Sequence, residues 1–190
     1  MKISKNLLTL LLIAIISMAC STVETDNEIL NEVANEDPIT EIDAPKKLTF
    51  ELTMGLDKLE ENSYNLLANM QLDEGAYYGS PYSNNGFNGL FNIEIAENDQ
   101  LIVSDTLIET PFPVEVYDGF SDGKVRWVKE ETNYKQLLTV NSQDDFEVTG
   151  VVLFVVEPVC SRYEVAFVIT SKAGELSITQ AKPIVANLSN

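Results

Sequence analysis

The stretch FEVTGVVLFVVEPVCSRYEVAFVI, residues 146–169, contains two runs of β-branched and aromatic residues around a short connection. Such residues favour strands because their side chains pack well on a pleated sheet. We therefore predict two long strands joined by a short loop. The loop contains Cys160, one of two cysteines in the chain.

Period-2 alternation of apolar and polar residues continues through most of the chain after residue 47. It is clear in LTFELTM (48–54), YNLLANMQL (64–72), GLFNIEIA (89–96), KVRWVKEE (124–131) and NYKQLLTV (133–140). Turn-rich loops separate these segments, which is typical of an antiparallel β-sandwich and not of a parallel sheet with crossover helices. We predict a single all-β sandwich domain over residues 48–190. Trp127, which has charged neighbours, is expected to point into its core.

The first 20 residues, MKISKNLLTLLLIAIISMAC, have the character of a secretion signal. Two lysines precede a short apolar run, which is too short for a comfortable membrane span. The Ala19-Cys20 exit resembles the lipobox of bacterial lipoproteins, with Ser17 at a position where Bacteroidetes-type lipoproteins tolerate it. We expect a signal peptide over residues 1–19, lipidation of Cys20 and anchoring in the cell envelope, at the outer membrane. An ordinary cleaved signal with a coincidental cysteine is the alternative.

Residues 20–47 are predicted to be the lipidated cysteine followed by a flexible tether. After Cys20 the segment is acidic and polar and contains no aromatic residue. It cannot bury enough apolar surface to offset the entropy lost on ordering. Its acidic residues also resemble the export signals that send some Bacteroidetes lipoproteins to the cell exterior. The alternative is that they only keep the tether solvated.

The composition excludes several classes of function. The chain has 12 Lys and Arg against 30 Asp and Glu, a formal net charge of −18, and no histidine. So acidic a chain repels nucleic acid, which we exclude as a partner. Without histidine, serine-histidine-acid and cysteine-histidine catalysis are impossible. The membrane, through the lipid on Cys20, and a periplasmic or surface protein are the expected partners.

Four segments follow the order found in a known family. They are DEGAYYGSPYS (73–83), ETPFPVEVYD (109–118), NYKQLLTV (133–140) and the closing unit 146–169. Together they resemble the N-terminal periplasmic domain of DsbD-type thiol:disulfide interchange proteins. The resemblance implies an immunoglobulin-like antiparallel β-sandwich, with Tyr77 or Tyr78 shielding the cysteine site.

In that family two cysteines before the last strand pass electrons to partner proteins. By position Cys160 matches the second cysteine, while Phe154, Val155 and Val156 stand where the first would lie. Dithiol exchange needs one thiol to form a mixed disulfide and another to resolve it. The resemblance therefore implies a redox-inactive binding or adaptor module. Thiol-disulfide exchange through Cys160 alone is the alternative, and the only enzymatic activity we consider.

Three interpretations of Cys160 remain open from the sequence. It could be a small buried hydrophobe at a strand edge. It could be a single reactive thiol, which the nearby Arg162 would favour and Glu157 would oppose. It could also form an intermolecular disulfide in an oxidising compartment.

The loop GAYYGSPYSNNGFNGLF is the main candidate for a binding surface. Tyr, Ser, Gly and Asn give binding loops contact area and adaptable hydrogen bonds, and we single out Tyr77, Tyr78, Tyr82 and Phe87. A carbohydrate-binding surface lipoprotein is the second alternative function. The tyrosines could equally cap one end of the core. Acidic pairs such as Asp144-Asp145 fit solvated turns better than calcium loops, so we expect no metal and no cofactor.

Overall fold

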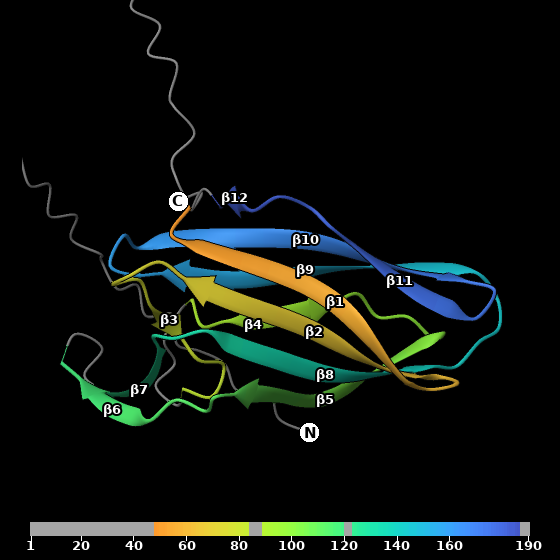
Figure 1. Cartoon of the computed structure of the whole chain (residues 1–190), viewed down its shortest axis with the longest axis horizontal. Helices are drawn as coiled ribbons and strands as arrows, with labels where there is room; N and C mark the ends of the chain where they lie inside the picture. Colours follow the sequence, from red (N-terminus) through yellow and green to blue (C-terminus); the bar gives the residue numbers. More distant parts are fainter. Residues whose placement is uncertain (1–47, 84–88, 120–122, 187–190) are drawn as a thin grey trace, which may run out of the picture. The chain divides into compact units, whose positions relative to one another are not determined.

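The computed structural model describes residues 48–83, 89–119 and 123–186. All of them belong to the compact unit Pro45–Asn190. Every regular element of the described residues is a β-strand, and every strand pairing among them is antiparallel (Figure 1). The prediction of an all-β antiparallel sandwich is confirmed. The predicted signal peptide, the predicted tether and Cys20 lie outside the described residues.

Two large sheets form the sandwich. The first has the order β1 (Phe50–Glu60), β2 (Ser63–Leu72), β8 (Thr132–Val140), β5 (Leu101–Thr110). The second has the order β11 (Glu175–Gln180), β10 (Ser161–Lys172), β9 (Phe146–Val156), β4 (Asn92–Ile95), with β12 (Ile184–Val185) also paired to β10. The predicted strand pair is therefore β9 and β10, which align without interruption from Phe146↔Ser171 to Val156↔Ser161.

The core lies between the inner faces of these sheets, as the period-2 pattern requires. Phe50 of β1 packs its ring edge-on against Phe154 of β9 and Tyr163 of β10, with ring centroids 4.8 and 4.7 Å apart. The other fully buried side chains of this core include Leu66, Met70, Leu138, Val152, Val165 and Ile169.

The side chain of Gln180 connects the two large sheets at one edge of the sandwich. Its Oε1 accepts from the Met54 amide at 2.8 Å, and its Nε2 donates to the Leu52 carbonyl at 2.7 Å. Gln180 ends β11 of the second sheet, whereas Leu52 and Met54 belong to β1 of the first. The two sheets are thus tied together at this edge.

A third, small sheet has the order β3 (Tyr78–Gly79), β7 (Gly123–Val128), β6 (Glu115–Asp118). Figure 1 shows it at one end of the sandwich, at the lower left. Tyr78 and Val128, which are cross-strand partners, are buried in the core and join this sheet to it. The prediction that Trp127 is a core residue is wrong. Trp127 is half-buried and lies outside the core because its side chain alternates away from that of Val128.

Candidate functional site

The four aromatic residues predicted to form a binding loop do not share one surface. Tyr78 is fully buried, in agreement with the alternative that tyrosines cap the core. Tyr77 is half-buried, with its ring edge-on to Trp127 at 5.0 Å between centroids. Tyr82 is 38% exposed. Phe87 lies outside the described residues.

Exposed apolar side chains gather instead around the small sheet. We define the small-sheet patch as Tyr82 together with Phe112 (55% exposed), Val114 (79%), Val116 (44%) and Tyr117 (68%). The last four lie on β6 or in the segment that leads into it. The rings of Tyr82 and Phe112 are in contact, and Val114 and Val116 line one hollow. Clusters of exposed apolar side chains on a folded protein mark interaction surfaces.

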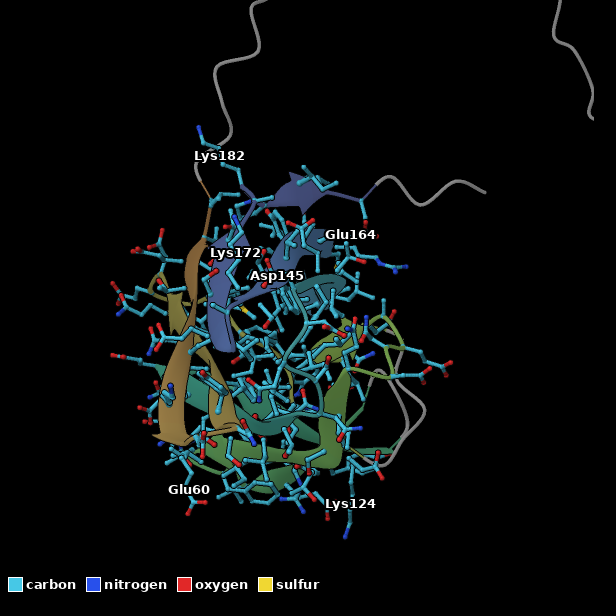
Figure 2. The ribbon with its side chains drawn as sticks, turned by 90° about the vertical axis from the view of Figure 1, so that its right-hand side faces the viewer. Glu60, Lys124, Asp145, Glu164, Lys172 and Lys182 are labelled. Carbon is cyan, nitrogen blue, oxygen red and sulfur yellow. The ribbon has the colours of Figure 1, made fainter. Side chains whose placement is uncertain are left out.

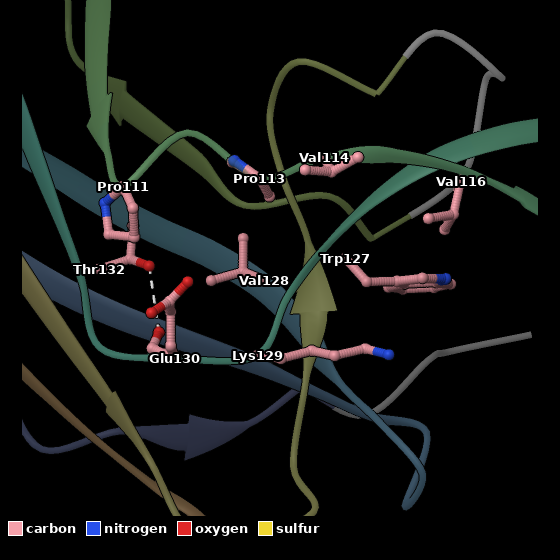
Figure 3. Close-up of a pocket in the computed structure, with 9 residues that line it drawn as sticks. All are labelled: Pro111, Pro113, Val114, Val116, Trp127, Val128, Lys129, Glu130 and Thr132. Atoms are coloured by element: carbon pink, nitrogen blue, oxygen red, sulfur yellow. Dashed lines mark hydrogen bonds between the residues drawn. The ribbon is translucent and has the colours of Figure 1, made fainter.

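A hollow of about 250 Å³ lies beside the patch. Val114 and Val116 line it together with Pro111, Pro113 and Trp127 (Figure 3). Figure 3 shows the Trp127 side chain between Val116 on one side and Lys129 on the other. The walls are therefore mainly apolar, as is usual for sites that accept a side chain or a small ligand.

Arg126 of β7 holds the patch in place. Its Nη1 donates to the Pro113 carbonyl at 3.0 Å, and its Nη2 lies 3.7 Å from a Glu115 carboxylate oxygen. The guanidinium also lies over the Phe112 ring, 4.9 Å from its centroid. The Tyr82 ring contacts Phe112 as well, at 5.5 Å between centroids. These contacts hold Phe112 and the segment before β6 against β7.

A buried carboxylate lies under the same segment. Glu109, near the end of β5, is 6% exposed. It accepts hydrogen bonds from the Ser80 hydroxyl at 2.6 Å and the Tyr134 hydroxyl at 2.7 Å. Since Tyr134 donates its proton to Glu109, the Tyr78 hydroxyl donates to Tyr134, at 3.0 Å. The chain of bonds links β5, β8 and the strand β3 of the small sheet.

Burial has the largest effect on the pKa values of the side chains in this cluster. It raises the pKa of Glu109 above its usual range, although the hydrogen bonds from Ser80 and Tyr134 and the charge of Arg126 act in the opposite direction. Burial also raises the pKa of Tyr78 and Tyr134, so both phenols stay protonated at neutral pH. The sequence analysis missed Glu109. The signal was its place in the alternation of DTLIET (105–110), two residues after Leu107 on the inward side of β5.

Cys160 lies in the loop between β9 and β10, and its side chain is exposed. The interpretation of Cys160 as a buried hydrophobe is therefore wrong. Its thiol donates a hydrogen bond to Glu157 Oε2 at 2.9 Å, and this bond, together with the negative charge of Glu157, raises the pKa of the thiol. Arg162 pairs with Glu164 at 3.8 Å. The surroundings of the thiol thus favour its protonated, less nucleophilic form.

Two of the three positions at which the first family cysteine is expected belong to the core. Phe154 and Val156 are fully buried, and Val155 donates its amide to the Gly89 carbonyl at 3.0 Å. The loop itself is joined to the segment before β3, because Tyr77 and Glu157 exchange two main-chain hydrogen bonds of 3.1 and 2.8 Å. Tyr77 therefore lies beside the cysteine loop, whereas Tyr78 faces the core.

In the part of the chain that the structure describes, no group of His, Cys, Asp or Glu side chains could hold a metal ion. Asp145 accepts the Ala173 amide at 2.9 Å, as expected for a carboxylate in a turn. No helix among these residues is long and apolar enough to cross a membrane.

No protein-family model matches the sequence, and no curated protein is similar to it.

Proposed function

We propose that this chain is a lipid-anchored protein of the bacterial cell envelope whose β-sandwich binds a protein partner without catalysing a reaction. The small-sheet patch is the observation that carries the proposal. It presents Phe112, Val114 and Tyr117 to solvent with more than half of each side chain exposed. Leaving such side chains in water is unfavourable by about 25 cal/mol for each Å² of apolar surface that a partner could cover.

The anchor and the family relationship are parts of the same proposal. The signal-like N-terminus and Cys20 support lipidation and a place at the outer membrane. The order of segments described above supports an immunoglobulin-like sandwich related to the N-terminal domain of DsbD-type proteins. The absence of a cysteine at residues 154–156 supports an adaptor that has lost the dithiol chemistry of that family.

Neither alternative function gains support from the described residues. Thiol-disulfide exchange through Cys160 is opposed by Glu157, which stabilises the protonated thiol. Carbohydrate binding by the aromatic loop is opposed by the burial of Tyr78, which removes one ring from any stacking platform.

Site-specific photo-crosslinking tests the proposal. A photoreactive amino acid is placed at Val114 in the full-length protein, expressed in its native cells, and a second variant carries it at Ile184. Ile184 is a suitable control because it is 60% exposed but lies on β12, outside the patch. We expect a discrete adduct with another protein from position 114 and none of that size from position 184. The adduct should disappear when Phe112→Ser is added.

The same adduct from both positions, or none from position 114, would overturn the proposal. A circular dichroism spectrum of each purified variant shows that the sandwich has folded. Loss of the adduct in Phe112→Ser then reports on the surface and not on the fold, because Phe112 is an exposed residue outside the core.

A further inference from the structure

We infer that the partner binds as an extended strand along β6, through an apolar segment with basic flanks. This inference rests on the proposed function and specifies its mode of binding. In the order β3-β7-β6, β6 is the terminal strand, and the described residues contain no strand beyond it. A sheet edge offers main-chain hydrogen bonds to an incoming strand, and pockets for alternate side chains add specificity.

The two faces of this edge both suit such a strand. The register pairs Val116 with Val125 on one face and Glu115 with Arg126 on the other. On the first face Val116 joins Val114 and Trp127 around the hollow of about 250 Å³. On the second face Arg126 supports Phe112. Because side chains of a strand alternate, successive residues of the partner would enter the hollow and contact Phe112 in turn.

The two edges of the first sheet, β5 and β1, are less suited to strand addition. The pairing of β5 is interrupted between Val103 and Leu107, and the Gln136 side chain already donates to the Ser104 carbonyl there. The Tyr82 hydroxyl also donates to the Leu107 carbonyl. The edge of β1 is tied to β11 through Gln180. Main-chain groups at these two edges are thus partly occupied by the protein's own side chains.

The negative net charge of the chain favours binding of a basic partner over binding of a second copy of the chain. The chain carries a formal net charge of −18, so two copies repel each other and cationic segments are attracted. Within the small sheet Glu115 lies 3.5 Å from Lys124 and 3.7 Å from Arg126. With Asp118 of β6 there are two carboxylates against two cations, so the sheet carries no formal net positive charge. Figure 2 shows Lys124 extending outward from the ribbon, away from the body of the sandwich.

A labelled peptide with the sequence KKTVYVTVKK, blocked at both ends, provides the probe. Its central residues favour an extended conformation, and its lysines supply the basic flanks. Binding to the folded protein is followed by fluorescence anisotropy. We expect saturable binding that Val114→Lys weakens by about tenfold or more, as does N-methylation of alternate peptide amides, which removes main-chain donors. Ile102→Lys adds the same charge at a 55% exposed position on β5 and should leave binding unchanged.

Three results would overturn the inference. The first is no saturable binding of the peptide. The second is binding that survives N-methylation, because strand pairing needs those amides. The third is a dimer in sedimentation experiments that Val114→Lys dissociates, because the patch would then be covered by a second copy. If the crosslink from position 114 to another protein persists while the peptide fails, only the strand mode is wrong; if that crosslink is also absent, the proposed function fails as well.

Discussion

Glu109 illustrates how one buried residue couples the stability of the domain to pH. Burial raises the pKa of its carboxyl in the folded protein above the value of 4.5 for a free glutamate. A group with a raised folded pKa contributes stability that is fully present below the unfolded pKa and is lost as pH rises through the folded pKa. Protonated Glu109 is thus better accommodated than the carboxylate.

We therefore predict that Glu109→Gln removes one component of this pH dependence. As pH rises above the unfolded value of 4.5, the stability of the wild type relative to the variant should fall, because only the wild type must ionise a buried carboxyl. Urea unfolding at a series of pH values measures it. Tyr78 and Tyr134 do not interfere, since burial raises the pKa of both phenols.

Glu51→Gln is the matched control, because it removes the same charge from an exposed position on β1. If the unfolding free energies of the wild type and of Glu109→Gln change in parallel with pH, burial does not govern the ionisation of Glu109. The Glu51→Gln variant shows how much of any difference comes from the loss of a charge alone.

At Cys160 a neighbouring carboxylate sets the reactivity of the thiol. The hydrogen bond to Glu157 and its negative charge both raise the pKa of Cys160. We predict that Glu157→Gln makes Cys160 react severalfold faster with an aromatic disulfide reagent at neutral pH, because the thiolate is the attacking species. The release of the reagent's chromophore measures the rate.

Glu164→Gln removes an equal charge from β10 without touching the thiol, since Glu164 pairs with Arg162. It should react at the wild-type rate. A wild-type thiol that already reacts as fast as Glu157→Gln would restore thiol-disulfide exchange as a candidate function.

On the scale of an element, β9 depends on a glycine in its middle. An added Cβ at Gly150 would lie 2.2 Å from Cζ of Phe167, its cross-strand partner on β10. We predict that Gly150→Ala destabilises the protein by about 2 to 3 kcal/mol, because the Phe167 ring is fixed in a close-packed core and cannot move away freely. Thermal and urea unfolding measure the change.

Gly55→Ala in β1 is the comparison, since the nearest side-chain atom to an added Cβ there is 4.0 Å away. We expect a change within about 0.5 kcal/mol for that variant. In Gly150→Ala/Phe167→Leu the loss should be smaller than the sum of the two single losses, because the ring that collides is gone. Additive losses would show that the collision does not limit packing.

The elements differ in how far the sequence predicts them. The pairing of β9 with β10 follows from two adjacent β-type runs, where neighbours in sequence become neighbours in space. The small sheet could not be predicted, because β3 and β7 meet across some fifty residues and their pairing depends on tertiary packing. Tertiary packing also decides which face of β7 meets the core, and for this reason the prediction for Trp127 is wrong. The Glu109 cluster leaves only a weak local signal, because its members come from β3, β5 and β8.

At the scale of the whole molecule, charge and apolar surface act together. The large excess of acidic residues makes copies of the chain repel one another, while the small-sheet patch remains exposed. An exposed apolar patch on a neutral domain would promote self-association. For the basic partner that we propose, the acidic composition predicts a rate of association that falls as salt rises.

The link made by Gln180 joins the beginning of the domain to its end. Its side chain bonds to main-chain groups of Leu52 and Met54, which lie 128 and 126 residues earlier. Whether the chain folds during synthesis or after export, β1 receives these two bonds only when β11 is present. A chain truncated before residue 180 would therefore leave the Met54 amide and the Leu52 carbonyl without these partners.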